Sequence, residues 1–295
     1  MIIAVASGKG GTGKTTVSVN LAGVSGPGIQ LIDCDVETPN AHLFLRGRPI
    51  SEEAAGNLVP RIDESACNGC GDCSDFCQFN AIAATGRTAM VFSELCHGCG
   101  GCMLVCGRNA ISEVDSRIGS VATMDCGHIR FVQGRLDIGI SSVSPLIHAV
   151  AKRIKPDTDA ILDAPPGTSC PAVATLRHAD FALLVTEPTP FGLHDLELAV
   201  ATARELGVPC GVVINRHGTG DGRIQAFCRD ERIPVLLELP DDRRIAEAYS
   251  QGRLLIDALP EYRGLFAQLR DAILEHNIPS PKRPASTASV LGGSR

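Results

Sequence analysis

Cysteines are distributed very unevenly along this chain of 295 residues. Eight of the 13 cysteines lie within the 40 residues from Cys67 to Cys106. They form two runs of the pattern C-x₂-C-x₂-C-x₃-C, each followed by Asn-Ala-Ile, and the second run repeats the first after 29 residues. An internal repeat of this kind indicates a small unit built from two similar halves.

The spacing within each run favours iron–sulfur ligation. Three thiolates spaced three residues apart in a glycine-containing turn can reach three irons of one cubane, whereas the fourth cysteine serves the other cluster. Zinc is the main alternative, but it takes its ligands as two close pairs, which fits duplicated four-cysteine runs poorly. We therefore expect two [4Fe–4S] clusters, with the ligands Cys67, Cys70, Cys73 and Cys106 for the first and Cys96, Cys99, Cys102 and Cys77 for the second.

Composition excludes several other classes of protein. A secreted disulfide scaffold is normally short and rich in cysteine throughout. No charged leader is visible, so we expect reduced thiols in a cytoplasmic protein. No apolar run reaches the ~18 residues of a membrane span. The formal net charge of −6, with two tyrosines and no tryptophan, argues against a nucleic-acid-binding protein.

Outside the cysteine-rich segment, short apolar runs alternate with amphipathic helical patterns. This alternation predicts an α/β fold, doubly wound around a mostly parallel sheet. The expected strands cover residues 2–7, 29–33, 160–163, 181–186, 210–215 and 234–239. The expected helices cover residues 14–24, 144–154, 193–206, 222–229, 241–250 and 261–276.

The cysteine-rich segment interrupts this alternation, which resumes after it, so we expect an inserted domain. We place the two parts of the α/β domain at residues 1–57 and 117–276. Residues 58–116 are expected to form an α+β domain of the bacterial ferredoxin type. The tail, residues 277–295, is rich in Pro, Ser and Gly and poor in apolar residues, so we expect it to be disordered.

A phosphate-binding loop is predicted directly after the first strand. Residues 8–15 satisfy the motif G-x-x-x-x-G-K-S/T between an expected strand and an expected helix. Backbone N–H groups of such a loop surround phosphate oxygens, and the helix dipole adds to the attraction. Lys14 is expected to reach the β- and γ-phosphates and Thr15 to bind Mg²⁺. The expected nucleotide-binding residues here are Gly8, Lys9, Gly10, Gly11, Thr12, Gly13, Lys14, Thr15 and Thr16.

An additional lysine in this loop carries a family resemblance. Lys9, in Lys-Gly-Gly-Thr-Gly-Lys-Thr, resembles the signature lysine of the deviant Walker A motif in the MinD, ParA, NifH and Mrp ATPases. Up to about residue 276, the chain is similar to MinD-superfamily P-loop NTPases that carry an inserted ferredoxin domain. In that group the lysine reaches the phosphates of the neighbouring subunit. The resemblance implies an ATP-dependent homodimer, or a heterodimer with a related chain, whereas the plain alternative is a solvated surface lysine.

The same resemblance assigns roles to polar residues at strand ends. Asp33 and Asp35 resemble the Asp-x-Asp of the first switch, which implies that Asp35 orients the attacking water and Asp33 lies near the Mg²⁺ shell, or the reverse. The segment Asp163-Ala-Pro-Pro-Gly167 resembles Walker B with the second switch. It implies that Asp163 holds Mg²⁺ through water and that the Gly167 N–H senses the γ-phosphate. Asn215 resembles the asparagine that recognises adenine, although Asp and Asn at strand ends are also common helix N-caps.

Five cysteines lie outside the two runs, and most are expected to be ordinary core residues. Cys170 is different because it lies seven residues after Asp163. At that offset NifH-type proteins carry a cysteine that binds a cluster bridging the dimer. The resemblance therefore raises a third, bridging cluster at Cys170, with Cys126 as a candidate second ligand.

Three functions are compatible with these features. The first is an ATPase that couples nucleotide state to electron transfer through the two clusters. The second is an Mrp-like carrier or scaffold ATPase for metallocofactor assembly, in which the clusters are cargo. The third, a MinD- or ParA-like positioning ATPase, requires an amphipathic C-terminal helix or a basic patch, and the sequence shows neither. We expect the first function, with slow hydrolysis unless a partner completes the site. We expect an unidentified redox protein or metalloprotein as partner, and neither nucleic acid nor membrane.

Overall fold

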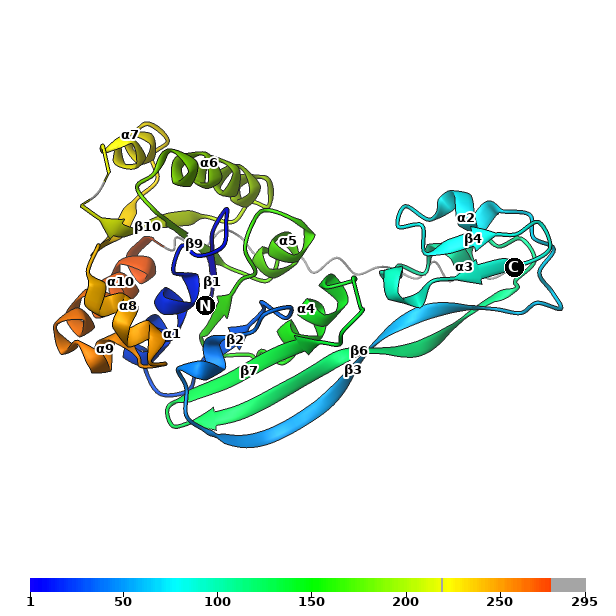
Figure 1. The fold of residues 1–295 in the computed structure, drawn as a ribbon, viewed down its shortest axis with the longest axis horizontal. Coiled ribbons are helices and arrows are strands. Elements are labelled where there is room, and N and C mark those ends of the chain that lie inside the picture. Colours follow the sequence, from blue (N-terminus) through cyan, green and yellow to red (C-terminus); the bar gives the residue numbers. More distant parts are fainter. Residues whose placement is uncertain (219, 277–295) are drawn as a thin grey trace.

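The apolar runs of the sequence form one nine-stranded sheet, in the order β11-β10-β9-β1-β8-β2-β7-β6-β3 (Figure 1). The computed structural model describes residues 1–218 and 220–276. The seven strands from β11 to β7 are parallel, so the prediction of a mostly parallel α/β sheet is confirmed. The six expected strands are β1 (Ile2–Ala6), β2 (Ile29–Asp33), β8 (Ala160–Asp163), β9 (Phe181–Thr186), β10 (Cys210–His217) and β11 (Val235–Pro240).

The central strands are buried on both faces, which explains their continuous apolar character. β8 and β9 are buried at every residue. Along β1, Ala4 and Ala6 belong to one hydrophobic core, whereas Ile3 and Val5 belong to the other. Successive side chains of a strand point to opposite faces, so the sheet separates two cores.

Helices cover both faces of the sheet (Figure 1). One core includes side chains of α4 (Ser144–Ala151), α5 (Cys170–Leu176), α6 (Pro190–Glu205) and α7 (Arg223–Asp230). The other includes side chains of α1 (Lys14–Val24), α9 (Leu255–Ala258), η3 (Pro260–Tyr262) and α10 (Arg263–His276). α8 (Arg243–Ser250) contacts α9. Among the residues described, no helix is both long and apolar enough to cross a membrane.

Several helix ends differ from the sequence expectation. α4 ends at Ala151 rather than at residue 154. α6 begins at Pro190 rather than at residue 193, because Thr189 caps it by accepting a hydrogen bond from the Gly192 N–H and proline is favourable in the first turn. α8 begins two residues later than expected, because Asp242 is its N-cap. The expected disordered tail lies outside the described residues.

Three strands of the sheet have no counterpart among those expected from the sequence. β7 (Ile129–Leu136) is parallel to β2, and β6 (Ile111–Cys126) and β3 (Arg48–Ile62) extend the sheet in antiparallel fashion. β3 and β6 stay paired from Arg48 opposite Asp125 to Ile62 opposite Ile111. Together they run from the sheet to the cysteine-rich module, which projects from the α/β body (Figure 1). The module is therefore attached by a continuous two-stranded ribbon.

The cysteine-rich module folds as two similar halves. α2 (Asp72–Phe76) and α3 (Gly101–Val105) occupy the same place in the repeat, 29 residues apart. Between them lie η2 (Ser93–Leu95) and a small antiparallel sheet of β4 (Ile82–Ala84) and β5 (Ala89–Val91). The sequence repeat is also a repeat of backbone conformation, because equivalent residues have positive φ in both halves: Gly69 and Gly98, Gly71 and Gly100, and Asn80 and Asn109.

Candidate functional site

Most of the nucleotide-binding residues expected from the sequence lie at the carboxyl edge of three neighbouring strands. β1, β8 and β2 lie side by side at the centre of the sheet. The register places Val5 opposite Asp163, and Asp163 opposite Asp33. The loop that follows β1 therefore begins beside two carboxylates. In open α/β sheets this edge is where ligands bind.

The loop of residues 8–15 has the backbone of an anion-binding turn. Gly11 and Gly13 have φ values of 79° and 96°, which favour glycine. A Cβ atom at Gly13 would collide with the side-chain amide of Asn215. That amide donates a hydrogen bond of 2.8 Å to the Thr12 carbonyl. Asn215 therefore supports the loop directly, and its side chain also lines the cavity above it.

Lys14 is buried against the loop and is only 8% exposed. Its ammonium group donates to the Ser7 hydroxyl at 2.9 Å and to the Lys9 carbonyl at 3.4 Å. Burial lowers the pKa of Lys14, while the negative charges of Asp163 and Asp35 raise it. A phosphate in the loop would add the negative charge that stabilises a buried ammonium.

Thr15 and Asp163, for which the sequence predicts Mg²⁺ binding, are in direct contact. The Thr15 hydroxyl donates to Asp163 Oδ2 at 2.7 Å, and its oxygen lies 2.9 Å from Asn40 Oδ1. Ser18 donates to Asp163 Oδ1 at 2.9 Å. Burial raises the pKa of Asp163, and the hydrogen bonds from Thr15 and Ser18 lower it. A hydroxyl beside a carboxylate provides the oxygen ligands that Mg²⁺ prefers.

Asp33 and Asp35 occupy different positions relative to the cavity. Asp35 lines the cavity, and burial raises the pKa of its carboxyl group. Asp33 is completely buried, and burial, followed by the charge of Asp163, raises the pKa of its carboxyl group. Its oxygens accept hydrogen bonds from the backbone N–H groups of Asp35, Asn40 and Ala41. Asp33 thus fixes the segment after β2, whereas Asp35 faces the space available to a ligand.

Lys9 is held by an ion pair within its own chain. Its ammonium lies 3.4 Å from Glu187 Oε2, and Arg216 lies 2.9 Å from the other carboxylate oxygen. Glu187 directly follows β9 and is 8% exposed. A lysine that reaches a neighbouring subunit would first have to leave this carboxylate.

A cavity of about 560 Å³ lies over the phosphate-binding loop. One wall contains Lys14, Thr15 and Asp35, and the opposite wall comes from the segment after β11 and the first turns of α8. That wall includes Asp241, Asp242, Arg243, Ile245, Ala246 and Tyr249. The cavity therefore has a phosphate-binding end and a separate wall that a base or ribose could contact.

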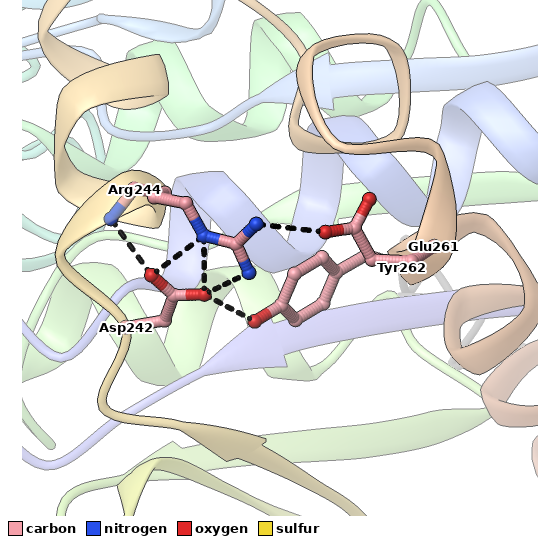
Figure 2. Close-up of polar contacts among 4 residues, drawn as sticks. All are labelled: Asp242, Arg244, Glu261 and Tyr262. Carbon is pink, nitrogen blue, oxygen red and sulfur yellow. Dashed lines mark hydrogen bonds and ion pairs between the residues drawn. The ribbon is translucent and has the colours of Figure 1, made fainter.

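Figure 2 shows the hydrogen bonds that fix this second wall. Asp242 accepts from the Arg244 backbone N–H at 2.9 Å and from the Arg244 guanidinium at 2.7 Å. The Tyr262 hydroxyl donates to the same carboxylate at 3.0 Å, and Glu261 accepts from Arg244 at 3.0 Å. Hydrogen bonds from Arg244 lower the pKa of Asp242 to about 2. The start of α8 is thereby tied to the segment that precedes α10.

The second-switch segment folds back on the phosphate-binding loop. Gly167 has a φ of 90°, and its N–H donates to the Ser7 carbonyl at 3.0 Å. The neighbouring Pro166 lines the cavity. Contact between the Gly167 N–H and a phosphate would therefore require this hydrogen bond to open.

The two cysteines considered for a bridging cluster lie at opposite edges of the sheet. Cys170 is the first residue of α5, at the carboxyl edge, and is exposed. Cys126 ends β6 and pairs with Ile129, which lies opposite Ile29 at the start of β2. Cys126 therefore does not meet Cys170 within one chain. A cluster that bridges two chains stays a prediction.

The eight cysteines of the two runs line two cavities. The inner cavity contains Cys77, Cys96, Cys99 and Cys102, and the outer cavity contains Cys67, Cys70, Cys73 and Cys106. We call them inner and outer because Leu58 and Pro60 line the first, whereas Ile62, at the far end of β3, lines the second. The fourth cysteine of each run lies with the first three of the other run, as the spacing predicts. All 13 cysteines lie within the described residues, and none of them forms a disulfide.

The chemistry of these two donor sets is compatible with iron–sulfur clusters, because each set consists of four thiols. Within residues 1–218 and 220–276, no group of three or more His, Cys, Asp or Glu side chains is arranged to hold one metal ion. A zinc site needs four ligands converging on one ion, whereas in a cubane each thiolate binds its own iron. The N–H groups of Gly98 and Ala110 point to the sulfurs of Cys96 and Cys106, both at 3.4 Å. Such N–H···S contacts favour a negatively charged cluster.

Sequence reasoning did not identify several residues that shape the nucleotide site. Ser18 and Asn40 position Asp163 and Thr15, but isolated polar residues on a helix or turn carry no motif. Glu187 and the wall from Asp241 to Tyr249 follow β9 and β11. Both segments resemble strand-end segments of the MinD superfamily, but this resemblance gives their residues no role in the site.

Comparisons with known proteins agree with this geometry. The family described as "CobQ/CobB/MinD/ParA nucleotide binding domain" matches residues 3–256. Uncharacterized protein MJ0579 of Methanocaldococcus jannaschii is 31% identical over 266 residues, which cover 85% of this chain and 90% of that protein. Uncharacterized ATP-binding protein MJ0169 of the same organism is 27% identical over 303 residues, which cover 99% of this chain and 88% of that protein.

Solved structures share the fold. The cell division ATPase MinD of Pyrococcus furiosus has a TM-score of 0.57 at 22% identity, covering 93% of this chain and 98% of that one. The septum site-determining protein MinD of Pyrococcus horikoshii, complexed with Mg-ADP, has a TM-score of 0.57 at 21% identity, covering 92% and 95%. At these identities the likeness concerns the fold alone. The family match, in contrast, spans most of the sequence, and the chain therefore belongs to the CobQ/CobB/MinD/ParA family of nucleotide-binding domains.

Proposed function

We propose that this protein is an ATPase that couples its nucleotide state to electron transfer through two [4Fe–4S] clusters. The observation that carries the proposal is the continuity of the sheet between the two sites. β3 and β6 are strands of the nucleotide-binding sheet and also frame the cysteine-rich module. A rearrangement at the nucleotide site therefore has a rigid route to the cysteines.

The nucleotide is proposed to be ATP with Mg²⁺. The family match, the ATP-binding description of MJ0169 and the Mg-ADP bound by the Pyrococcus horikoshii MinD support this choice. Lys14 would bind the β- and γ-phosphates, and Thr15 would bind Mg²⁺, with Asp163 holding a water of its shell. Asp35 would accept a hydrogen bond from the attacking water.

Hydrolysis is proposed to occur in a dimer of this chain or of this chain with a related one. Lys9 would leave Glu187 and contact the phosphates bound to the neighbouring subunit. The rate per chain should then rise with protein concentration in the wild type and stay low in Lys9→Ala. Rapid hydrolysis that does not depend on concentration would contradict this step.

The inner and outer cysteine sets are each proposed to bind one [4Fe–4S] cluster, which supplies one-electron transfer when bound. The chain's contribution is ligation by the eight thiolates, N–H donation from Gly98 and Ala110, and partial exclusion of water. At the inner cavity, Phe79 stacks on His97 with ring centroids 3.7 Å apart, and both line the cavity. An electron-donating or electron-accepting protein is the implied partner.

The decisive experiment compares the midpoint potentials of the clusters with ATP, with ADP and without nucleotide. Anaerobically purified protein should contain close to eight irons per chain, the sum of two cubanes. We expect at least one potential to differ between the ATP and ADP states in the wild type. The difference should disappear in Lys14→Ala, which loses the phosphate contact but keeps all eight cysteines. Identical potentials in all states of the wild type would refute the proposal.

Metallocofactor assembly is the second candidate function. A cytosolic Fe-S cluster assembly factor Nubp2 homolog of Anopheles gambiae is 26% identical over 119 residues, which cover 34% of this chain and 46% of that protein. If the clusters are cargo, iron and sulfide should move to an apo-acceptor in an ATP-dependent manner. Under the electron-transfer proposal they remain bound to this chain.

A bridging cluster at Cys170 is a separate proposal that requires the dimer. Cys170 is exposed at the carboxyl edge, next to the second-switch segment. A second chain could therefore bring its own Cys170 to the same place. Cys170→Ala with unchanged iron content per dimer would eliminate this site.

A further inference from the structure

We infer that the loop of residues 137–143 transmits the nucleotide state to the inner cysteine cavity and not to the outer one. This inference rests on the proposed function, because it assigns the route by which the two sites communicate. The loop connects β7 to α4 and lies on the side of the α/β body that faces the cysteine-rich module (Figure 1).

The inner cavity is the one that adjoins the α/β body. The ribbon of β3 and β6 passes the inner cavity first, at Leu58, Pro60 and Glu113, and ends at the outer cavity, at Ile62 and Ile111. The inner set of cysteines is thus closer to the sheet along the chain that connects them.

A direct contact joins the loop to the inner cavity. The Ser141 hydroxyl donates to the Glu94 carbonyl at 2.9 Å, and the Ser141 N–H donates to the same oxygen at 3.4 Å. Glu94 stands two residues before Cys96, a lining residue of the inner cavity. From the ribbon, the Asn57 side chain donates to the Cys96 carbonyl at 2.9 Å. Cys96 is therefore positioned by groups from the ribbon and from the loop.

Contacts at the two ends of the loop lead to the segments that follow β2 and β8, and both of these segments border the nucleotide cavity. Leu136, the last residue of β7, donates its N–H at 2.9 Å to the carbonyl of Val36, the neighbour of Asp35. At its other end the loop leads into α4, which packs against α5, the helix that follows the Asp163–Gly167 segment. His148 of α4 and His178 after α5 are also in contact, with ring nitrogens 3.2 Å apart. Movement of either segment would therefore act on the loop.

The loop contains two unfavourable features that another conformation would relieve. Ser142 is 1% exposed, and in the part of the chain that the structure describes its hydroxyl has no hydrogen-bond partner. Ile138 is completely exposed. A buried hydroxyl without a hydrogen-bond partner destabilises the observed conformation, so a conformation that pairs the Ser142 hydroxyl would compete with it.

Around the outer cavity, the described residues form hydrogen bonds within the module itself. The Cys67 N–H donates to the Asp63 carbonyl at 2.9 Å, and the Cys70 N–H donates to the Asn68 side-chain oxygen at 3.3 Å. Asp63 in turn donates its N–H to the Ala110 carbonyl. A displacement of residues 137–143 would thus reach the outer cysteines only through the module as a whole.

Hydrogen–deuterium exchange of the cluster-loaded chain tests the mechanical step. We expect a non-hydrolysable ATP analogue to change the exchange of residues 137–143 and 93–99 relative to ADP. Residues 63–73, around the outer cavity, should not change. Equal changes around both cavities, or no change in residues 93–99, would overturn the inference.

Cluster potentials in three variants test the redox consequence. Ser141→Ala removes one of the two hydrogen bonds to Glu94, and Ser141→Pro removes both. Ser65→Ala is the matched control, because it removes a serine hydroxyl that bonds to Asp63 beside the outer cavity. The iron content of each variant should equal that of the wild type. The two potentials are assigned with Cys70→Ser, which perturbs only the outer set.

The nucleotide-dependent shift should occur at the inner cluster in the wild type and in Ser65→Ala. It should shrink in Ser141→Ala and vanish in Ser141→Pro. A full shift in Ser141→Pro, or a shift confined to the outer cluster, would overturn the inference while leaving the proposed function intact. No shift in the wild type would refute the proposed function, and the exchange experiment would then decide on the mechanical link alone.

Discussion

The α/β body and the cysteine-rich module are stabilised by different means. The α/β body has strands that are buried at every residue and a hydrophobic core on each face of the sheet. Between residues 63 and 110, in contrast, the buried apolar side chains are Ala81, Ile82, Ala89 and Ala110. Larger apolar side chains of this module are exposed, among them Phe76, Phe79, Met90, Leu95 and Leu104.

The cysteine-rich module should depend on its ligand more than the α/β body does. A unit of this size with so few buried side chains gains little stability from hydrophobic burial. Four of its glycines with positive φ, which are Gly69, Gly71, Gly98 and Gly100, instead line two cavities together with its eight thiols. In the α/β body, the candidate nucleotide site is itself buried, because Lys14 and Asp163 are both buried and lie next to each other. The body should therefore fold without its ligand, whereas the module should need one.

Removal of iron is the change with the largest expected effect on this comparison. Chelation should expose the amides of residues 63–110 to rapid exchange, because metal binding supplies most of the folding free energy of such modules. The amides of β1, β8 and β9 should stay protected. Mass-resolved hydrogen exchange measures both regions in one sample, and Cys210→Ser, outside the module, should behave like the wild type. Equal protection of the module with and without iron would contradict the conclusion that the module needs its ligand to fold.

Loss of Lys14 should have the largest effect within the body. Lys14→Ala removes the buried ammonium and should lower the rate of ATP hydrolysis by about 10²–10³-fold, the usual effect of removing one stabilising group. Iron content and exchange of the module should not change, since the cysteines are untouched. The exposed Lys152→Ala is the control. Loss of iron in Lys14→Ala would show that the α/β body and the cysteine-rich module are not stabilised independently.

The pH dependence of stability should expose the cost of burying carboxylates in the body. A raised pKa means that folded Asp163 holds its proton more tightly than the unfolded chain does. The contribution of Asp163 to the free energy of unfolding is therefore fully present below the pKa that this residue has in the unfolded chain. It is lost as the pH rises through the raised pKa of the folded protein. The melting temperature of the nucleotide-free protein should fall between about pH 4 and neutrality, and less steeply in Asp163→Asn.

Calorimetry in the absence of Mg²⁺ measures this slope. The exposed Asp230→Asn serves as control and should keep the slope of the wild type. An identical slope in Asp163→Asn and the wild type would mean that Asp163 does not contribute.

The smallest expected effect concerns the second wall of the nucleotide cavity. Tyr262→Phe removes the hydrogen bond to Asp242, which is worth about 1 kcal/mol. If this wall contacts the base or ribose and not the reacting phosphate, the KM for ATP should rise about two- to fivefold with little change in kcat. Tyr249→Phe is the variant for comparison, because Tyr249 lines the same cavity. A fall in kcat alone would contradict this assignment.

Continuous apolar runs and spaced motifs made much of the body predictable. Strands buried on both faces have sequences that differ clearly from their surroundings, so all six expected parallel strands are present. The pairing of the cysteines into two sets followed from ligand spacing, because a short turn restricts where each thiol can reach. The proximity of Asp33 and Asp163 followed from their positions at the ends of parallel strands.

The ribbon and the ion pair of Lys9 were not predictable in the same way. β3 carries Pro49, Gly56 and Pro60 and is mostly exposed, so it lacks the pattern of a buried strand. The contact between Lys9 and Glu187 joins residues that are far apart in sequence and close only because their strands are neighbours. Periodicity reports which side of an element is buried, but not which distant charge lies opposite.

The antiparallel ribbon also makes the chain unusually easy to shorten. Asn57 and Ser116 lie opposite each other on β3 and β6, and antiparallel neighbours can be joined by a two-residue turn such as Asn-Gly. Replacing residues 58–115 with that turn would yield a shorter chain with the phosphate-binding loop intact and an uninterrupted hairpin. The same geometry means that a single insertion event into a hairpin tip would have been enough to give an ancestral NTPase its cysteine-rich arm.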